Sequence, residues 1–237
     1  MTSLTRAFCI KDLSFSWRRT GRPDLMISEL SLNEGELALI TGPSGSGKTS
    51  LLNLLSGVTV ADSGRLEVLG QDMSVLGASK RDSFRADNIG LIFQIFNLLP
   101  YLSVLENIML AGTFSAGRQR RTGDLAAQAD MLLDALDLPP GTFAAREVNT
   151  LSIGQQQRVA AARALAGTPR LIIADEPTSA LDAANRDRFI DLITNLCRDR
   201  GATLVVVSHD EALAPFFDRR INMSDINSAM DGKVGGA

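Results

Sequence analysis

The sequence contains little cysteine and histidine and no long hydrophobic run: two cysteines and one histidine occur among 237 residues. Cys9 and Cys197 lie far apart and form no C-x-x-C pair, so neither a disulfide framework nor a zinc site is expected, and a reducing cytosol is the natural setting. No window approaches the roughly 20 apolar residues of a membrane-spanning helix, and residues 1–10 lack the apolar core of a signal peptide. Any membrane role is therefore expected to come through a partner.

An excess of positive charge is also missing, because the formal net charge is −3. The two arginine clusters, residues 18–22 and residues 118–121, are short and far apart, and we interpret both as solvated loops. A nucleic-acid-binding face is therefore not expected. No Asn-Lys-x-Asp motif for reading guanine occurs, which disfavours a GTPase. With 45% hydrophobic residues, the chain can form the continuous core of one large domain.

What the sequence does contain is a G-x-x-x-x-G-K-[ST] motif between a predicted strand at residues 37–40 and a predicted helix that begins near residue 50. Its glycines let the backbone N–H groups wrap a polyphosphate, and the helix N-terminus favours negative charge. A mere Gly/Ser-rich turn would need neither Lys48 to meet the β and γ phosphates nor Thr49 to bind Mg²⁺. The residues expected to contact a nucleotide here are Gly42, Pro43, Ser44, Gly45, Ser46, Gly47, Lys48, Thr49 and Ser50.

Two acidic residues and the histidine follow predicted central strands. Asp175 and Glu176 end the apolar run at residues 171–174, and His209 comes shortly after the run at residues 203–207. Because ligands of open α/β sheets bind at the carboxyl ends of the strands, these side chains are expected at one edge. Asp175 there could hold Mg²⁺ and Glu176 could deprotonate an attacking water, although two solvated turn residues are the alternative. His209 is expected to reach the γ phosphate.

The first part of the chain predicts a small antiparallel layer, since residues 8–15 and 25–32 both have strand patterns. Trp17, at the end of the first strand, fits either an adenine-stacking role or the cover of a sheet edge. A further strand is expected at residues 65–69. The charged stretch at residues 80–88 is interpreted as a separator before the next strand, which Gln94 ends.

The middle of the chain predicts helices at residues 102–112 and 125–138, within a mostly helical lobe at about residues 95–165. Ser152 and Gln155 form a capping-box pattern at the start of a later helix. That helix start could bind an anion close to Gly154, although an ordinary cap is the simpler interpretation. The apolar stretch at residues 95–101 fits either core or a partner-binding patch, and composition alone favours core.

Taken in order, these motifs resemble the ATP-binding subunit of ABC transporters over essentially the whole chain. Residues 151–158 look like the family signature, upstream of Asp175 and Glu176. The resemblance implies an α/β P-loop NTPase core with an N-terminal antiparallel β layer. It also implies a helical subdomain inserted at about residues 95–165 within the single domain 1–237.

The resemblance also implies residue roles, with ATP and Mg²⁺ as ligands. Glu176 corresponds to the general base, His209 to the switch histidine and Gln94 to the glutamine that senses Mg²⁺ and the attacking water. Trp17 corresponds to the adenine-stacking aromatic, with Phe15 as the alternative.

The family implies a head-to-tail homodimer in which ATP held by Lys48 of one subunit is covered by the signature of the other. Ser152, Gly154 and Gln155 are retained in that signature, but Ile153 stands where the family usually has glycine. The dimer-crossing loop ends at Asp182. We expect γ-phosphate binding to survive this departure, and the hydrolysis rate is left open.

Residues 91–100, continuing to residues 105–108, are similar to the ATPases of lipoprotein release and macrolide export and to their cell-division relative. This resemblance reverses the preference for core. It implies a separate integral membrane permease that docks between Phe96 and Tyr101, and a cytoplasmic subunit held on the inner face of the membrane through that permease without insertion. The expected function is ATP hydrolysis that powers export or extraction of a lipid-linked or amphipathic substrate.

Two other functions remain open at this stage. One is a cell-division-type ATPase that regulates a cell-wall hydrolase through a membrane partner, without transport. The other is a soluble ABC ATPase of DNA repair or translation, which is disfavoured by the single nucleotide-binding domain and the absence of a coiled-coil or basic insertion.

Overall fold

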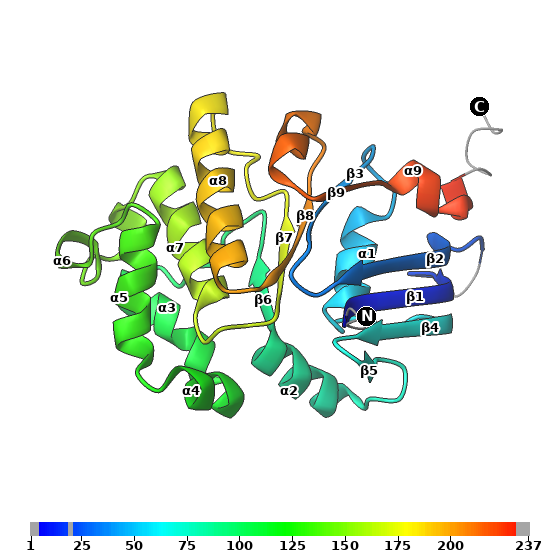
Figure 1. Ribbon diagram of the computed structural model, residues 1–237, viewed down its shortest axis with the longest axis horizontal. Helices are drawn as coiled ribbons and strands as arrows, with labels where there is room; N and C mark the ends of the chain where they lie inside the picture. The colour runs from blue at the N-terminus through cyan, green and yellow to red at the C-terminus, as the bar shows by residue number, and fades with distance from the viewer. Residues whose placement is uncertain (1–4, 19–20, 231–237) are drawn as a thin grey trace.

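Two β-sheets form the frame of the molecule, which is a computed structural model that describes residues 5–18 and 21–230 (Figure 1). Arg19 and Thr20, in the first arginine cluster, lie outside the described residues. The first sheet is antiparallel, in the order β2-β1-β4-β5. Its strands are β1 (Arg6–Phe15), β2 (Leu25–Asn33), β4 (Ser63–Val68) and β5 (Gln71–Asp72).

The second sheet is parallel, in the order β6-β7-β8-β3-β9. Its strands are β3 (Leu37–Thr41), β6 (Ile89–Ile92), β7 (Leu171–Asp175), β8 (Thr203–Val207) and β9 (Arg219–Asn222). The strands β3 and β8 are buried at every residue, as expected for a parallel sheet covered on both faces. The fold class predicted from the sequence, with an antiparallel layer beside a parallel core, is confirmed.

Helices cover the parallel sheet on both faces. The longer ones are α1 (Lys48–Leu55), α2 (Ala78–Asn88), α3 (Val104–Thr113), α4 (Ala116–Thr122), α5 (Leu125–Ala135), α7 (Ile153–Leu165) and α8 (Ala183–Asp199). Short helical turns are α6 (Pro140–Phe143), η1 (Val148–Thr150), η2 (Glu211–Phe216), α9 (Met223–Ile226) and η3 (Ser228–Met230). In Figure 1, α3 to α7 lie at one end of the molecule and the antiparallel sheet lies at the other.

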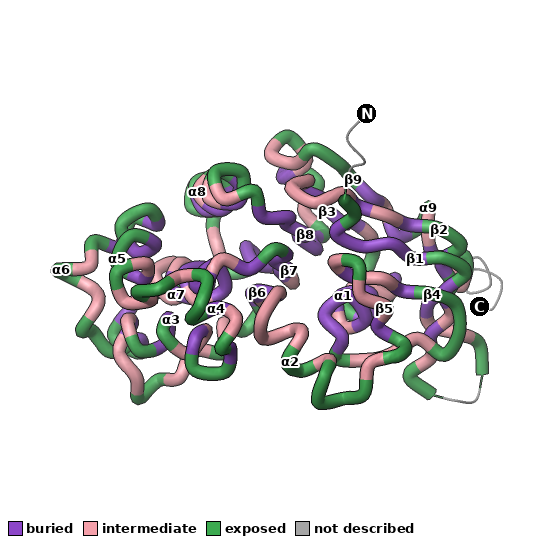
Figure 2. Tube along the Cα trace, turned by 60° about the horizontal axis from the view of Figure 1, so that its bottom comes forward, coloured by how far each residue is buried: buried purple, intermediate pink, exposed green. Residues whose placement is uncertain are grey.

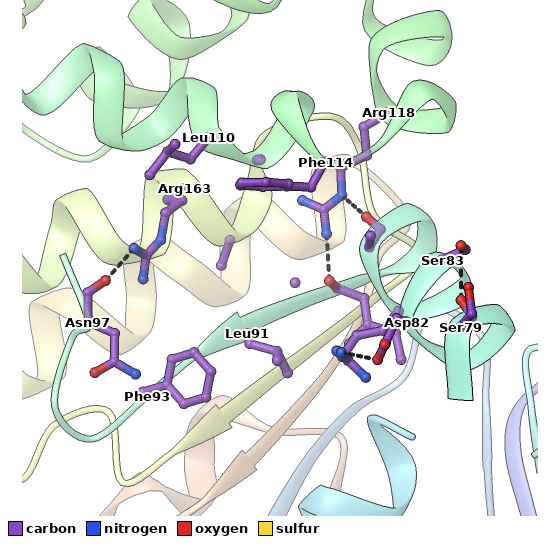
Figure 3. A pocket seen from close by; sticks show the side chains of 16 residues that line it. Ser79, Asp82, Ser83, Leu91, Phe93, Asn97, Leu110, Phe114, Arg118 and Arg163 are labelled. Atoms are coloured by element: carbon purple, nitrogen blue, oxygen red, sulfur yellow. Dashed lines mark hydrogen bonds and ion pairs between the residues drawn. The ribbon is translucent and has the colours of Figure 1, made fainter. Parts of the chain in front are cut away.

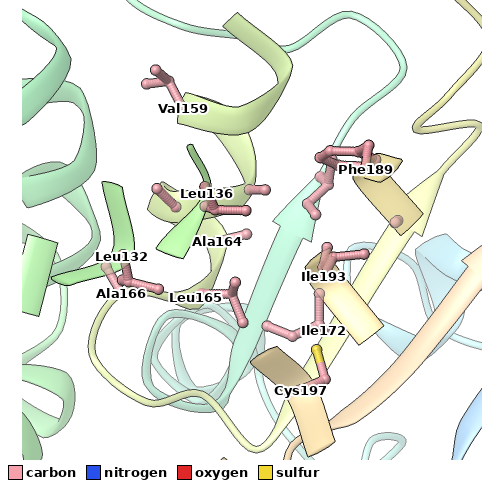
Figure 4. Close-up of a cluster of buried hydrophobic side chains, with 14 of the residues drawn as sticks. Leu132, Leu136, Val159, Ala164, Leu165, Ala166, Ile172, Phe189, Ile193 and Cys197 are labelled. Carbon is pink, nitrogen blue, oxygen red and sulfur yellow. The ribbon is translucent and has the colours of Figure 1, made fainter. Parts of the chain in front are cut away.

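Two apolar clusters fill the space on either side of the parallel sheet. Alternate residues of one strand enter different clusters, so Ile172 faces α7 and α8 while Ile173 faces α1 and the antiparallel sheet. Figure 4 shows Ile172 close to Ile193 and Cys197 of α8, with Leu165 of α7 beside it. The first cluster continues without a break into α3 and α5, so these helices share the core of the sheet.

The charged stretch at residues 80–88 was predicted to be a separator between strands, but it forms most of α2. No residue of α2 is fully buried, and the helix runs along the surface in Figure 2. The sequence signal was weak because α2 is strongly polar, with Phe84 as its one large apolar residue.

Arg118 corrects the interpretation of residues 118–121 as a solvated loop, because it is buried on α4. Its guanidinium donates from Nε to Ala86 O (2.7 Å), from Nη1 to Ala166 O (2.8 Å) and from Nη2 to Ile89 O. Burial lowers the pKa of Arg118 to about 10, which leaves the group charged at neutral pH. The side chain therefore joins α4 to the ends of α2 and α7 and to the first residue of β6.

Replacing Arg118 by methionine should strongly destabilise the fold. The carbonyls of Ala86, Ile89 and Ala166 would each lose a buried donor, at about 1–3 kcal/mol apiece, so we expect the free energy of unfolding to fall by roughly 3 kcal/mol or more. Urea denaturation followed by circular dichroism measures this. The matched control is Arg120→Met on the exposed side of α4, with an expected change within about 0.5 kcal/mol. Equal stability of the two variants would contradict the bridging role of Arg118.

Candidate functional site

A cleft of about 500 Å³ opens at the carboxyl edge of the parallel sheet, where β3, β6 and β7 end. Every residue of its lining except Asp24 was predicted from the sequence as a site residue. The lining residues are Trp17, Asp24, Ser44, Gly45, Gly47, Lys48, Thr49, Ser50, Gln94, Asp175, Glu176 and His209. The topology thus brings together side chains that are far apart along the chain.

The loop between β3 and α1 forms one wall of the cleft. Gly47, the residue before α1, has φ 99°, and a Cβ there would lie 2.5 Å from Leu25 Cδ2, so only glycine fits. No side chain caps α1, which leaves its first N–H groups available to an anion in the cleft. The predicted residues Gly42, Pro43 and Ser46 do not line the cleft but build the loop behind it.

The Lys48 ammonium lies across this loop. Its Nζ donates to Gly42 O at 2.7 Å and to Pro43 O at 3.0 Å. These are bonds to neutral acceptors, and phosphate oxygens would be stronger, charge-assisted partners for the same N–H groups. Lys48 is therefore placed to exchange loop carbonyls for a phosphate.

Asp175, at the end of β7, faces Thr49 across the cleft. Thr49 Oγ1 donates to Asp175 Oδ2 at 3.3 Å. Burial raises the pKa of Asp175, and the Glu176 charge adds to this, while Thr49 and Lys48 act in the opposite direction. Two hard oxygen donors at this separation, with the Gln94 amide in the same cleft, are the kind of ligands that Mg²⁺ prefers. The residues present therefore fit a magnesium ion.

Glu176 is held from several sides. Its backbone is left-handed (φ 45°), an unfavourable conformation for a non-glycine residue, and its N–H donates to Val207 O at 2.9 Å. His209 Nδ1 lies 3.0 Å from both carboxylate oxygens, and Ser208 Oγ donates to one of them at 3.3 Å. The Glu176 side chain is 14% exposed and that of His209 is 71% exposed. The histidine predicted to reach a phosphate thus contacts the carboxylate here.

Gln94 was predicted to end the strand β6, but β6 ends at Ile92. Gln94 lies in the loop that follows and lines the cleft. Within the described residues, its exposed side chain makes no hydrogen bond. Its amide is therefore available to a ligand in the cleft.

Trp17 presents its indole to the cleft. The side chain is 56% exposed, its Nε1 donates to Ser50 Oγ at 2.8 Å, and its ring stands edge-on to Phe15, with 5.1 Å between the centroids. Phe15 itself is buried. Of the two aromatic candidates, Trp17 is the one with an open face for a base.

The signature residues lie in a second cleft, of about 440 Å³. It is lined by Ser152, Gly154, Gln155 and Asp182, and also by Ile153, whose side chain is exposed. The capping box is confirmed: Ser152 Oγ accepts from Gln155 N at 3.3 Å, and Gln155 Oε1 accepts from Ser152 N at 3.0 Å. Asp182 caps α8, and the bonds from Asn185 lower the pKa of its carboxyl. One subunit therefore does not bring these residues to Lys48.

Asn227 is a site residue that sequence reasoning missed. It is buried, its Oδ1 accepts from Met26 N at 2.9 Å, and its Nδ2 donates to Asp24 O at 3.1 Å and to Ser46 O at 3.0 Å. It thereby ties the loop before α1 to β2. A single asparagine in a polar stretch carries no sequence signal for such a role.

A third cavity, a groove of about 610 Å³, lies between α2, β6, α3, α4 and α7 (Figure 3). In this view, Phe114 lies between Arg163 and Arg118, above Leu91 and Phe93. Of residues 96–101, only Asn97 lines the groove. No residue from 95 to 101 is fully buried, although Leu98 packs against the first apolar cluster. The interpretation of this stretch as core, drawn from composition alone, is therefore wrong, and Ile95 and Tyr101 are exposed.

Comparisons with known proteins agree with this architecture. The model of the ABC transporter family matches residues 25–179. The chain is 39% identical to the lipoprotein-releasing system ATP-binding protein LolD of Porphyromonas gingivalis over 83% of its length and 88% of that protein. It is also 39% identical to the macrolide export ATP-binding/permease protein MacB of Rhodopirellula baltica, over 87% of this chain and 30% of that one.

Among solved structures, the chain resembles the dimeric post-hydrolysis state of the ATP-binding cassette MJ0796 bound to ADP and Pi. The TM-score is 0.79 at 34% identity, over 94% of this chain and 95% of that chain. Among the described residues, no helix of this chain is both long enough and apolar enough to cross a membrane.

Asn227→Ala should loosen the loop that carries Lys48, because Ser46 O, Asp24 O and Met26 N all lose their side-chain partner. We expect the free energy of unfolding to fall by about 1–3 kcal/mol, as for buried polar groups left unpaired. Thermal and urea unfolding measure it, with Asn149→Ala at an exposed position as the control. If the two variants are equally stable, Asn227 does not anchor the loop.

Proposed function

The chain belongs to the ABC transporter family as an ATP-binding and ATP-hydrolysing subunit, and we propose that it powers a separate membrane permease that exports or extracts a lipid-linked or amphipathic substrate. The observation that carries the chemistry is the single cleft that joins Lys48, Asp175 and Glu176. The substrate class rests on the likeness to LolD and MacB, whose names state lipoprotein release and macrolide export.

We assign the residues of the cleft as follows. The loop N–H groups and Lys48 bind the phosphates, and Trp17 stacks on the adenine. Thr49, Asp175 and Gln94 would hold Mg²⁺, which would neutralise charge on the phosphates. Ser50 orients the indole by the bond that it accepts from Trp17.

Glu176 accepts the proton of the attacking water. The new bond forms between the water oxygen and the γ phosphorus, and the bond from that phosphorus to the bridging oxygen breaks, which gives ADP and phosphate. His209 and Ser208 hold the Glu176 carboxylate, and Gln94, which follows the neighbouring strand β6, orients the water. The barrier falls mainly through positioning and charge neutralisation.

The separation of the two clefts supports a head-to-tail dimer. The second copy supplies Ser152, Gly154 and Gln155 to cover the ATP bound at Lys48, and the loop ending at Asp182 lies at the contact. The similar MJ0796 cassette is itself dimeric, which is consistent with this arrangement.

We further propose that residues 95–165 act as a helical subdomain that carries the signature, and that the groove beside it receives a cytoplasmic segment of the permease. The groove offers Phe93, Leu110 and Phe114 as apolar contacts. The subunit would then be cytoplasmic and peripheral, held on the inner face of the membrane by this contact.

Replacing Glu176 by glutamine should separate binding from hydrolysis. The amide cannot accept the proton, so we expect ATP binding within about 3-fold of wild type and a steady-state turnover at least ~10²-fold lower. Phosphate release and equilibrium binding of ATP measure the two. Glu211→Gln, in an exposed ion pair with Arg220, is the control with normal turnover. Near-normal hydrolysis by E176Q would remove Glu176 from the role.

Replacing Phe114 by aspartate should break docking. A carboxylate in an apolar contact is costly to desolvate, so membrane association should fall by at least ~10-fold while ATP binding is unchanged. Co-sedimentation with membranes of the native cell measures it. Met131→Asp, exposed on α5 outside the groove, should still associate, and Tyr101→Asp tests the segment predicted from sequence. Retained association of F114D would place the docking surface elsewhere.

The partner itself is tested by affinity capture. The tagged E176Q variant, loaded with ATP, should recover an integral membrane permease from gently solubilised membranes. Recovery of soluble proteins alone would overturn the transporter assignment and leave the ATPase assignment intact.

A further inference from the structure

Arg163, on α7, holds the chain just beyond Gln94. Its Nη1 donates to Asn97 O and its Nη2 to Phe96 O, both at 2.7 Å. Figure 3 shows the guanidinium turned from α7 towards Asn97. One arginine thus donates hydrogen bonds to two successive carbonyls of the loop that follows β6.

Because of these bonds, Gln94 lies in a short segment, residues 93–95, whose two ends are fixed. At one end, Ile92 is paired with Ala174 in the parallel sheet. At the other end, Phe96 and Asn97 are bonded to Arg163. The span between them, residues 93–95, is exposed throughout. Because its ends are fixed, the place of the Gln94 amide in the cleft depends on where Arg163 holds the loop.

The loop needs this support. Asn97 has φ 50°, a left-handed conformation that costs energy in a residue other than glycine. Further along, Asn107 holds the backbone of Leu99, accepting from its N–H at 2.8 Å and donating to its carbonyl at 3.1 Å. Arg163 is therefore the holding contact that is nearest to Gln94.

Arg163 also lines the groove. A guanidinium has five N–H donors, and among the described residues Arg163 bonds only to these two carbonyls, with no carboxylate partner. Burial lowers the pKa of Arg163, because the buried guanidinium loses hydration and has no nearby carboxylate in the described part of the chain to offset that loss. A segment seated in the groove would touch the same side chain that fixes the loop.

We infer that Arg163 is the positioning residue that sets Gln94 for hydrolysis. This inference rests on the proposed role of Gln94 in the ATPase cleft. If Arg163 acts through Gln94, replacing Arg163 has no further effect on kcat once Gln94 has been removed. A purely structural role for Arg163 would lower kcat in either background.

The test is a double-mutant cycle on the full chain, with Gln94→Ala, Arg163→Met and the double variant. We expect R163M to lower kcat by at least ~10-fold while the KM for ATP stays within ~3-fold, because the Lys48 loop is untouched. The double variant should be within ~2-fold of Q94A alone, as expected for residues that act as one unit. Arg198→Met on α8, which breaks an exposed ion pair with Asp218, is the matched control with normal kcat.

Arg163→Lys provides a second test in case R163M fails to fold. Lysine keeps the charge but lacks the planar fork that spans two carbonyls, so the same cycle with R163K should show a smaller loss of kcat and the same dependence on Gln94. Losses that multiply in the double variant, or a normal kcat in R163M, would overturn the inference while leaving the function standing. A normal kcat in Q94A would instead refute the proposed role of Gln94, and the inference with it.

Discussion

The chemistry of this ATPase subunit depends on the burial of one parallel sheet on both faces. Because β3, β7 and β8 run in the same direction through apolar surroundings, the polar residues that follow them can lie only at their carboxyl ends. Lys48, Asp175 and His209 come from three different strand ends and line one cleft for this reason. The antiparallel sheet adds Trp17 to the same cleft from its own edge.

The residues that the sequence predicted well are those whose signal is local. The run at residues 171–174 is continuous and apolar, so a buried strand and the two acids after it could be placed together, and β7 ends at Asp175. The spacing of glycines and Lys48 likewise defines a loop without knowledge of the rest of the chain. The capping box at Ser152 needs only a partner three residues away.

The residues that the sequence could not predict act over long range through backbone atoms. Arg118 bonds to carbonyls of three other segments, and nothing in a cluster of arginines separates one buried member from its exposed neighbours. The helix α2 has Phe84 as its one large apolar residue, so its polar sequence did not indicate a packed helix. Ile95 and Tyr101 are exposed, although the apolar composition of their segment favours core. Only the likeness to known ATPases predicted a partner-binding surface there.

The bond between Asn227 and Ser46 bears on how the chain matures during synthesis. The two residues are 181 positions apart, so Asn227 is synthesised long after the loop that holds Lys48. Strand β9, which flanks β3, is also late. Until residue 227 has left the ribosome and folded back, the phosphate-binding loop therefore lacks its Asn227 anchor.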